Sequence, residues 1–376
     1  MTSDKHLGFI DQLRGVAILL VALGHIFGYA ESRYPAPFEL LYTTPEPGEI
    51  AGFLFTSIFC NGFTGVMLFF VISGFCIRWS HLHAESFSFK NFYLRRIFRI
   101  YPAYLVWLVI FAAITSATAW DIGIHALLLH NLSTRSFGSI NPPFWSIALE
   151  WQIYLIYPVI LWVSKRLRPG IVLCLTAMIG IVSGVFGTLT VQNAFRSEFL
   201  TVIAQLPTWL LFPWMLGFYQ AEKLHSGKTV KPKGWWLPAT AGIAILIEAC
   251  PKIHVLRVVP WSLVACQWLQ FCCARPERSA SRWFKPLAFI GLISYSIYLG
   301  HDMVAHFYST LEKHLAIPSS SFQGGLLATL VCLPLFVLIG WLSYQLIEKP
   351  GIRMGGLLQR GWLQRGSLDS SAPTRP

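Results

Sequence analysis

The chain of 376 residues is built from a succession of apolar runs separated by short polar loops. Most of these runs are about 20 residues long, which is the length that an α-helix needs to cross the roughly 30 Å hydrocarbon core of a bilayer. Charged residues make up only 12% of the sequence, about half of the ~25% that is usual in soluble domains. We therefore predict an all-α polytopic membrane protein.

We predict about ten transmembrane helices, forming one domain over residues 1–354. Their ranges are 9–29, 51–77, 101–119, 144–163, 170–190, 199–219, 235–250, 255–273, 286–306 and 323–346. The first run contains Asp11, Arg14 and His25 and has no small-residue cleavage site, so we interpret it as a membrane helix and not as a signal peptide. Residues 355–376 are predicted to form a disordered cytoplasmic tail.

The loops between the runs alternate in charge. Lys and Arg gather in every second loop and in the tail, whereas the 31–50 loop has four glutamates and one arginine. Positively charged loops stay on the cytoplasmic side of a membrane, so both termini are predicted to be cytoplasmic. Only the 251–258 loop weakens this pattern. Topology signals of this kind also account for the net charge of +12, and nucleic acid is not an expected partner.

The first helix carries an unusual set of ionisable residues. Arg14 and His25 are eleven residues apart, so at about 100° per residue they lie on one helical stripe, about 16 Å apart along the axis. Asp11 can pair with Arg14 one turn away. Charged groups at the bilayer centre cost at least ~2.5–3.5 kcal/mol and usually mark function. An unperturbed histidine titrates near pH 6.5, which makes His25 a candidate general base, although a histidine hydrogen-bonded between helices is the structural alternative.

Glu150 is the second candidate for the chemistry. It lies seven residues after Pro143, or about 10 Å below the outer end of the fourth predicted helix, and therefore at a depth similar to that of His25. We predict that Glu150 orients His25 or stabilises its protonated form, because a buried carboxylate needs a partner. The alternative is a helix-packing carboxylate bonded to a tyrosine. His301 reaches the same outer layer and is a reserve candidate for the base.

Two arginines lie at the cytoplasmic mouth of the third predicted helix. Arg96 and Arg99 are three residues apart and can face one ligand, and guanidinium forks match phosphate oxygens. From composition alone, positive-inside anchoring explains them slightly better, and Arg78 has the same two interpretations. Glu348 needs no more than a structural salt bridge. None of the eight cysteines has metal-ligand spacing, and no metal site is predicted.

Six motifs together resemble acyltransferase family 3, the polytopic bacterial enzymes that O-acylate sugars and related hydroxyls. They occur in the family's order: Arg14 to His25, Gly65-Val-Met-Leu-Phe-Phe-Val-Ile-Ser-Gly74-Phe75, Arg96-x-x-Arg99, Trp145-Ser-Ile-Ala-Leu-Glu150-Trp, Ile293-Ser-Tyr-Ser-Ile-Tyr-Leu-Gly-His301 and Glu348-Lys-Pro350. Each motif alone is mostly apolar and weak, but six in order are specific.

The resemblance implies acetyl-CoA, or another acyl-CoA, as co-substrate, with no tightly bound cofactor. The acceptor would be a hydroxyl of a cell-envelope glycan or lipid-linked glycan at the bacterial inner membrane. By the same resemblance His25 is the catalytic histidine, and Arg14, Arg96 and Arg99 serve the donor. Direct transfer and an acyl-histidine intermediate both fit.

Some relatives carry an appended extracytoplasmic esterase-like domain, which is not expected here. The chain would then complete the transfer alone or with envelope-polysaccharide assembly proteins. The main alternative is a proton-coupled transporter or exporter, because buried Asp, Arg, His and Glu also suit a proton relay. Transporters often have repeated halves, and none is visible in this sequence. A non-catalytic assembly subunit is a third alternative.

Overall fold

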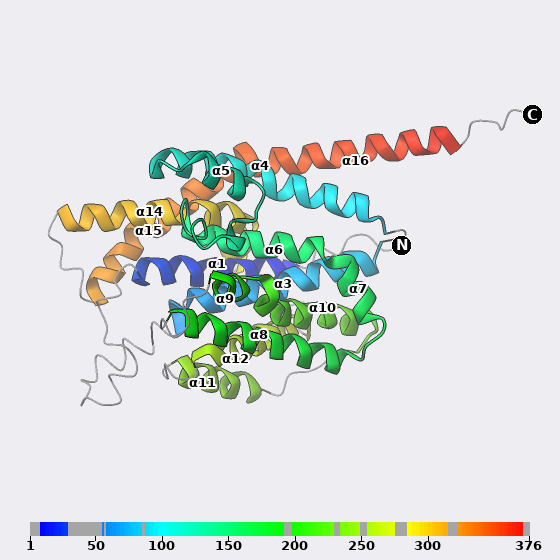
Figure 1. Ribbon diagram of the computed structural model, residues 1–376, viewed down its shortest axis with the longest axis horizontal. Coiled ribbons are helices and arrows are strands. Elements are labelled where there is room, and N and C mark those ends of the chain that lie inside the picture. Colours follow the sequence, from blue (N-terminus) through cyan, green and yellow to red (C-terminus); the bar gives the residue numbers. More distant parts are fainter. Residues whose placement is uncertain are drawn as a thin grey trace, which may run out of the picture.

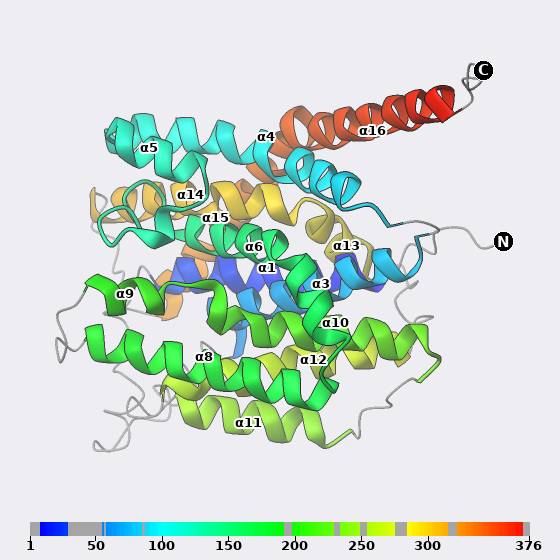
Figure 2. The ribbon, with the colours of Figure 1, turned by 45° about the vertical axis from the view of Figure 1, so that its right-hand side comes forward.

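Every secondary-structure element in the part of the chain that the computed structural model describes is a helix (Figure 1). That part comprises residues 8–28, 55, 58–84, 87–191, 198–228, 234–248, 254–274, 284–314 and 322–370. Figure 2 shows α1 in the middle of the bundle, with α4 and α16 on one side and α8, α11 and α12 on the other. The all-α prediction is confirmed for these residues.

Six helical stretches within the described ranges are long and apolar enough to cross a membrane. They are α1 (Gly8–Gly28), α3 (Gly62–Leu82), α4 (Phe89–Thr115), α8 (Pro169–Val191), the stretch that ends in α10 (Leu211–His225), and α15 (Phe322–Ser343) with its continuation α16 (Lys349–Ser370). Two further stretches are bent pairs. Helices α6 (Trp145–Leu155) and α7 (Tyr157–Ser164) meet at 56°, and α13 (Lys285–Leu292) and α14 (Ser294–His314) meet at 78°.

The described helices thus give six to eight membrane-capable spans. The two other apolar helices, α11 (Trp236–Glu248) and α12 (Val258–Ala274), have 13 and 17 residues. At about 1.5 Å per residue they are only ~20 and ~26 Å long, short of the ~30 Å hydrocarbon core. The count of ten and the cytoplasmic placement of both termini therefore stay predictions. The acidic 31–50 loop lies outside the described residues.

Helix α4 begins twelve residues earlier than the sequence predicts. Ser88 accepts a hydrogen bond from the backbone N–H of Asn91 and caps the helix, which then continues through Pro102. Membrane helices tolerate an internal proline because their neighbours satisfy the freed carbonyl. The predicted start at residue 101 is therefore wrong, and Arg96 and Arg99 lie inside the helix and not at its mouth.

Helix α16 also differs from expectation, because residues 355–370 are helical where a disordered tail is predicted. Its first turns pack closely against α4. A Cβ atom added to Gly351 would lie 2.8 Å from the Pro102 ring, and one added to Gly355 would lie 2.6 Å from Cβ of Phe98. The two glycines, four residues apart, let the helices approach, as small residues do in membrane proteins. The α16 helix then extends past the bundle (Figure 1).

A polar cap precedes α6 at the opposite end of the bundle. In it the short helix α5 (Ala119–Ala126) is joined to the following turns through Asp121, whose carboxylate accepts hydrogen bonds from Thr118, Ser136 and Ser139. These hydrogen bonds, above all that from Thr118, hold the pKa of Asp121 below its usual range. The cap leads directly into the Pro142–Phe144 turn that starts α6.

Helix α1 lies near the centre, with α3, α13, α14 and α15 around it. On one side Gly291 of α13 lies against it so tightly that a Cβ there would be 1.6 Å from the carbonyl oxygen of Asp11. On another side a Cβ on Gly65 of α3 would be 2.5 Å from the carbonyl oxygen of Ala17. These backbone-to-backbone contacts fix the rotation of α1 and hence the directions of its polar side chains.

At the crossing of α3 and α10, a glycine of each helix lies against the backbone of the other helix. A Cβ on Gly74 would lie 2.0 Å from the carbonyl oxygen of Trp214, and a Cβ on Gly217 would lie 1.9 Å from that of Val71. Neither contact can be relieved by a side-chain rotation, because the obstructing atom is backbone in both cases. Small residues at this crossing are therefore a requirement of the fold.

We expect Gly217→Ala to destabilise the protein by about 1–3 kcal/mol, the usual cost of overpacking a well-packed contact. Thermal unfolding of the detergent-purified protein, followed by size-exclusion chromatography, measures the effect. Gly123→Ala is the matched control, since no atom lies within 4 Å of the added Cβ there. Equal stability of the two variants would contradict the close α3–α10 crossing.

Candidate functional site

A polar cavity, here called the arginine cavity, lies between α1, α3, α4, α6 and α14. Its polar lining consists of Arg14, Ser73, Cys76, Arg96, Arg99, Ser146, Glu150, Tyr154, Ser294, Tyr295 and Tyr298. Arg14 lies on α1, Arg96 and Arg99 lie on α4 and Glu150 lies on α6, and the fold brings all four to one cavity. The family resemblance names the same three arginines, and their role toward the donor stays a prediction.

Arg14 is held by its own helix and by α3. Its Nη1 donates to Oδ1 of Asp11 at 3.0 Å, so the predicted pair at i,i+3 is confirmed. Its Nη2 lies 3.5 Å from Sγ of Cys76. The guanidinium is thereby fixed in direction, because both of its ends have partners. A buried arginine in a membrane helix needs such a partner, and Asp11 supplies the compensating charge.

Arg96 presents an unsatisfied donor to the same region. Its guanidinium lies over the rings of Tyr154, at 5.3 Å from the centroid, and of Phe92, at 5.7 Å. Cation–π contact of this kind stabilises the charge. However, the Nε atom is buried and has no hydrogen-bond partner among the described residues. A buried unpaired donor is costly, and an anionic or carbonyl ligand in the cavity would satisfy it.

Glu150 belongs to the arginine cavity and not to the surroundings of His25. Its carboxylate accepts a hydrogen bond from Tyr154, whose hydroxyl is also 3.0 Å from Oγ of Ser73. Ser146, Glu150 and Tyr154 are each four residues apart on α6 and share one face. The hypothesis that Glu150 orients His25 does not fit this geometry, and the tyrosine-bonded alternative does. Equal depth in the membrane had suggested the pairing, but depth does not fix the direction in which a helix face points.

Glu348 is a residue near this cavity that the sequence argument missed. Its side chain is buried, accepts a hydrogen bond of 2.7 Å from Oγ of Ser296, and is attracted electrostatically by Arg99 and Arg14. It ends the π-helical turn Tyr344–Glu348 between α15 and α16. Such turns are frequent at functional sites. The sequence motif Glu348-Lys-Pro350 could have pointed to this residue, but a structural salt bridge was enough to explain it from the sequence alone.

A second cavity, here called the histidine cavity, lies farther along α1. It is lined by Val21, Gly24, His25, Cys60, Gly62, Phe63, Val66, Pro142, Pro143, Trp145 and Tyr298. About a third of the His25 side chain is exposed, so its ring is available to a ligand in this cavity. Arg14 and His25 thus lie on one continuous helix, as predicted, but they serve different cavities.

Asp302 takes the place beside His25 that the sequence argument gave to Glu150. Its Oδ1 is 3.7 Å from Nδ1 of His25, within ion-pairing range but longer than a hydrogen bond. Catalytic hydrogen bonds are often long before a substrate binds. The neighbouring His301 packs edge-on against His25 with ring centroids 4.6 Å apart, but it is fully buried and does not line the cavity. Of the two histidines, His25 is the one placed to meet a substrate.

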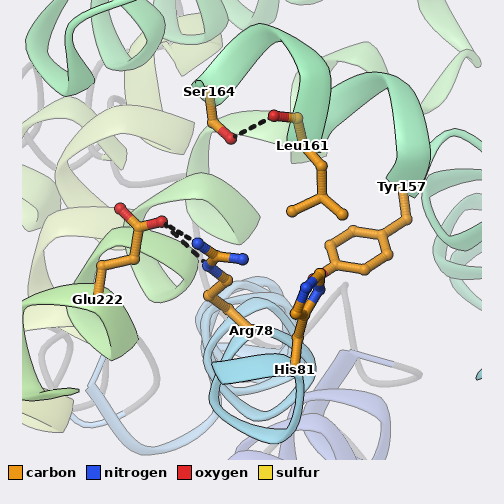
Figure 3. Close-up of polar contacts among 6 residues, drawn as sticks. All are labelled: Arg78, His81, Tyr157, Leu161, Ser164 and Glu222. Carbon is orange, nitrogen blue, oxygen red and sulfur yellow. Dashed lines mark hydrogen bonds and ion pairs between the residues drawn. The ribbon is translucent and has the colours of Figure 1, made fainter. Parts of the chain in front are cut away.

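The contacts of Arg78 give it a structural role between helices. Its Nε and Nη2 donate to one carboxylate oxygen of Glu222 at 3.0 and 2.6 Å (Figure 3). Its guanidinium lies 4.8 Å from the centroid of the Phe218 ring. Close by, Nδ1 of His81 is 2.9 Å from the hydroxyl of Tyr157 (Figure 3). These contacts join α3, α7 and α10 next to the glycine crossing. Arg78 is therefore an interhelical ion-pair partner in this structure.

Comparison with known proteins gives one family. A family model described as an acyltransferase domain matches residues 7–345. The acyltransferase MdmB of Streptomyces mycarofaciens is 26% identical over 330 residues, which cover 78% of this chain and 82% of that protein. BcsY of Komagataeibacter xylinus, which carries the name of a membrane-bound transacylase, is 27% identical over 379 residues, 91% of this chain and 82% of its own length.

A more partial match is the peptidoglycan O-acetyltransferase OatA of Listeria monocytogenes. It is 27% identical over 214 residues, which cover 50% of this chain and 29% of that protein. No solved structure matches the chain.

The arginine cavity yields a direct prediction about anions. Pyrophosphate should slow the alkylation of Cys76 by N-ethylmaleimide severalfold, because an anion bound to Arg96 and Arg99 would cover the thiol that lines the same cavity. Peptide mass spectrometry of the purified protein follows the modification of Cys76. The protection should disappear in Arg96→Ala/Arg99→Ala and persist in Arg95→Ala, whose side chain is exposed on the same helix. Equal alkylation with and without pyrophosphate in the wild type would exclude an anion site here.

Proposed function

The chain belongs to the acyltransferase domain family, and we propose that it moves an acetyl group from acetyl-CoA to a hydroxyl of a cell-surface polysaccharide, lipopolysaccharide or oligosaccharide. One observation carries the proposal. A cavity with three arginines and a cavity with an accessible histidine lie along the same helix and adjoin one another. A donor with phosphate groups and an acceptor with a hydroxyl need these two environments.

The arginine cavity is the proposed donor site. Arg96 and Arg99 are one turn apart on α4 and Arg14 faces them from α1, so their guanidinium groups can contact one anionic ligand from two sides. Arginine binds phosphate through paired hydrogen bonds, and the unsatisfied Nε of Arg96 offers one of them. The thioester end of the donor would then point along α1 toward His25. Positive-inside topology would place this cavity on the cytoplasmic side, where coenzyme A is available.

The histidine cavity is the proposed acceptor site. His25 acts there as the general base that takes the proton of the acceptor hydroxyl, a role worth about 10²–10⁴-fold in rate. Asp302 stabilises the imidazolium that forms, as a carboxylate does beside a catalytic histidine. Trp145 and Phe63 provide apolar walls beside this polar group, the combination that is typical of small-molecule sites. We place the enzyme in a bacterial inner membrane, with the acceptor reached from the outer face.

The donor site is tested by acetyl-CoA binding to the detergent-purified protein. We expect Arg96→Ala/Arg99→Ala to bind acetyl-CoA at least about 10-fold more weakly, because charge-assisted hydrogen bonds each contribute ~1.5–3 kcal/mol. Arg95→Ala should bind almost as the wild type does, and His25→Ala should bind acetyl-CoA but transfer no acetyl group to isolated cell envelopes. A folded wild type that does not bind acetyl-CoA would refute this donor.

The role of Asp302 is tested by Asp302→Asn, which keeps the size of the side chain and removes its charge. We expect kcat to fall at least about 10-fold while KM for acetyl-CoA stays nearly constant; the same change in a serine-protease triad costs ~10⁴-fold. Glu150→Gln is the comparison, and it should act mainly on KM because Glu150 lines the arginine cavity. If Glu150→Gln lowered kcat and Asp302→Asn did not, the assignment of Asp302 would be wrong.

A further inference from the structure

The arginine cavity and the histidine cavity meet at two side chains. Val66 of α3 and Tyr298 of α14 are the residues that line both of them. Both are buried, so together they form a partition between the two spaces. Val66 is β-branched and stiff at χ1. Tyr298 has a long side chain that can rotate as a unit, and it is therefore the part of the partition that can move.

The hydroxyl of Tyr298 is held at the start of α6 by two residues that line different cavities. It donates a hydrogen bond of 2.8 Å to the carbonyl oxygen of Pro143, which lines the histidine cavity. It is also 2.6 Å from Oγ of Ser146, which lines the arginine cavity. The ring itself packs edge-on against Phe69, with centroids 6.4 Å apart. The two hydrogen bonds thus lock the ring in the position that separates the cavities.

The locked position of the Tyr298 ring bears on whether water can reach the thioester of the donor. The side chain of His25 is about one-third exposed, so the histidine cavity admits water as well as an acceptor. Water is a competing nucleophile at a far higher concentration than any glycan. An enzyme that transfers acyl groups needs a means of keeping water from the activated acyl carbon until the acceptor is present.

We propose that Tyr298 is a gate between the donor and acceptor cavities, locked by Pro143 and Ser146, and that it directs the acyl group to the acceptor hydroxyl instead of to water. This inference rests on the proposed function. Acceptor binding against Pro143 and Trp145 would disturb the Pro143 hydrogen bond and release the ring. Opening would then let the acyl end of the donor pass from the arginine cavity to His25.

The gate would decide between two reactions of the thioester, transfer to the acceptor and hydrolysis by water, and each of them balances. In transfer, the C–S bond of the thioester breaks and a C–O bond to the acceptor oxygen forms, while His25 passes the hydroxyl proton on to the leaving thiolate. In the leak, a water oxygen takes the place of the acceptor oxygen, and the products are acetate and the coenzyme A thiol. A faulty gate therefore has a measurable signature, which is acetyl-CoA hydrolysis without acceptor.

The first test measures that leak. Tyr298→Phe keeps the ring and removes the hydroxyl that forms both hydrogen bonds. It should raise acceptor-independent acetyl-CoA hydrolysis by about 5- to 10-fold, the shift expected from losing one or two ordinary hydrogen bonds. Ser146→Ala removes one bond and should give a smaller rise. Tyr219→Phe is the matched control, because Tyr219 is buried on α10 outside both cavities; hydrolysis should stay at the wild-type rate.

The second test does not depend on activity and uses Cys76 as a reporter in the arginine cavity. A membrane-impermeant thiol reagent is applied to right-side-out and to inside-out vesicles, and modification of Cys76 is followed by mass spectrometry. In the wild type Cys76 should be modified from one side only. In Tyr298→Phe and in the larger opening Tyr298→Ala it should be modified from both sides. Burial raises the pKa of the Cys60 thiol to about 12, so that residue competes little for the reagent.

The outcomes separate the gate from the proposed function. If the wild type transfers acetyl groups and the Tyr298 variants show neither the leak nor two-sided labelling of Cys76, the gate is wrong and the function stands. If the wild type does not bind or use acetyl-CoA, the function is wrong, and the labelling experiment still decides whether Tyr298 separates the two cavities. A fall in transfer without leak or two-sided labelling would make Tyr298 a structural residue and overturn the gate.

Discussion

The position of helix α1 is the constraint on which the rest of the structure depends. This helix carries Asp11, Arg14 and His25 through a protein interior within the membrane, where ionisable groups need partners. The required partners come from α1 itself, where Asp11 pairs with Arg14, and from α14, where Asp302 lies beside His25. Backbone contacts with α3 and α13, possible only because those helices have glycine at the crossings, fix α1 between its partners.

The position of α1 also explains why the site consists of two cavities, the arginine cavity and the histidine cavity. Eleven residues separate Arg14 from His25, so a single helix presents a guanidinium to one cavity and an imidazole to the next. The neighbouring helices supply Arg96 and Arg99 to the first cavity and aromatic walls to the second, and Asp302 lies beside His25. Tyr298 stands where the two spaces adjoin, and its hydroxyl bonds with residues of both. Donor binding, base catalysis and the exclusion of water would then be functions of two adjoining cavities along α1.

Helix positions were largely predictable, and the exceptions have physical causes. The predicted range 170–190 is close to the observed Pro169–Val191, because an uninterrupted apolar run has the same ends in sequence and in structure. The ranges 144–163 and 286–306 each contain a break, at Ile156 and Ile293, which hydropathy does not register because an apolar residue can occupy a bend. The range 101–119 begins twelve residues too late, since the helix starts at the Ser88 cap and continues through Pro102.

The sequence by itself determined the membrane-helical class, the pairing of Asp11 with Arg14 and the common stripe of Arg14 and His25, because these follow from composition and from the fixed geometry of one helix. Only the tertiary structure decided which residues from different helices meet. It placed Glu150 with the arginines, Asp302 with His25, Glu348 near Arg99 and Arg78 with Glu222. Those meetings depend on how each helix is rotated about its axis, and that rotation is set by close packing between helices, which no single segment encodes.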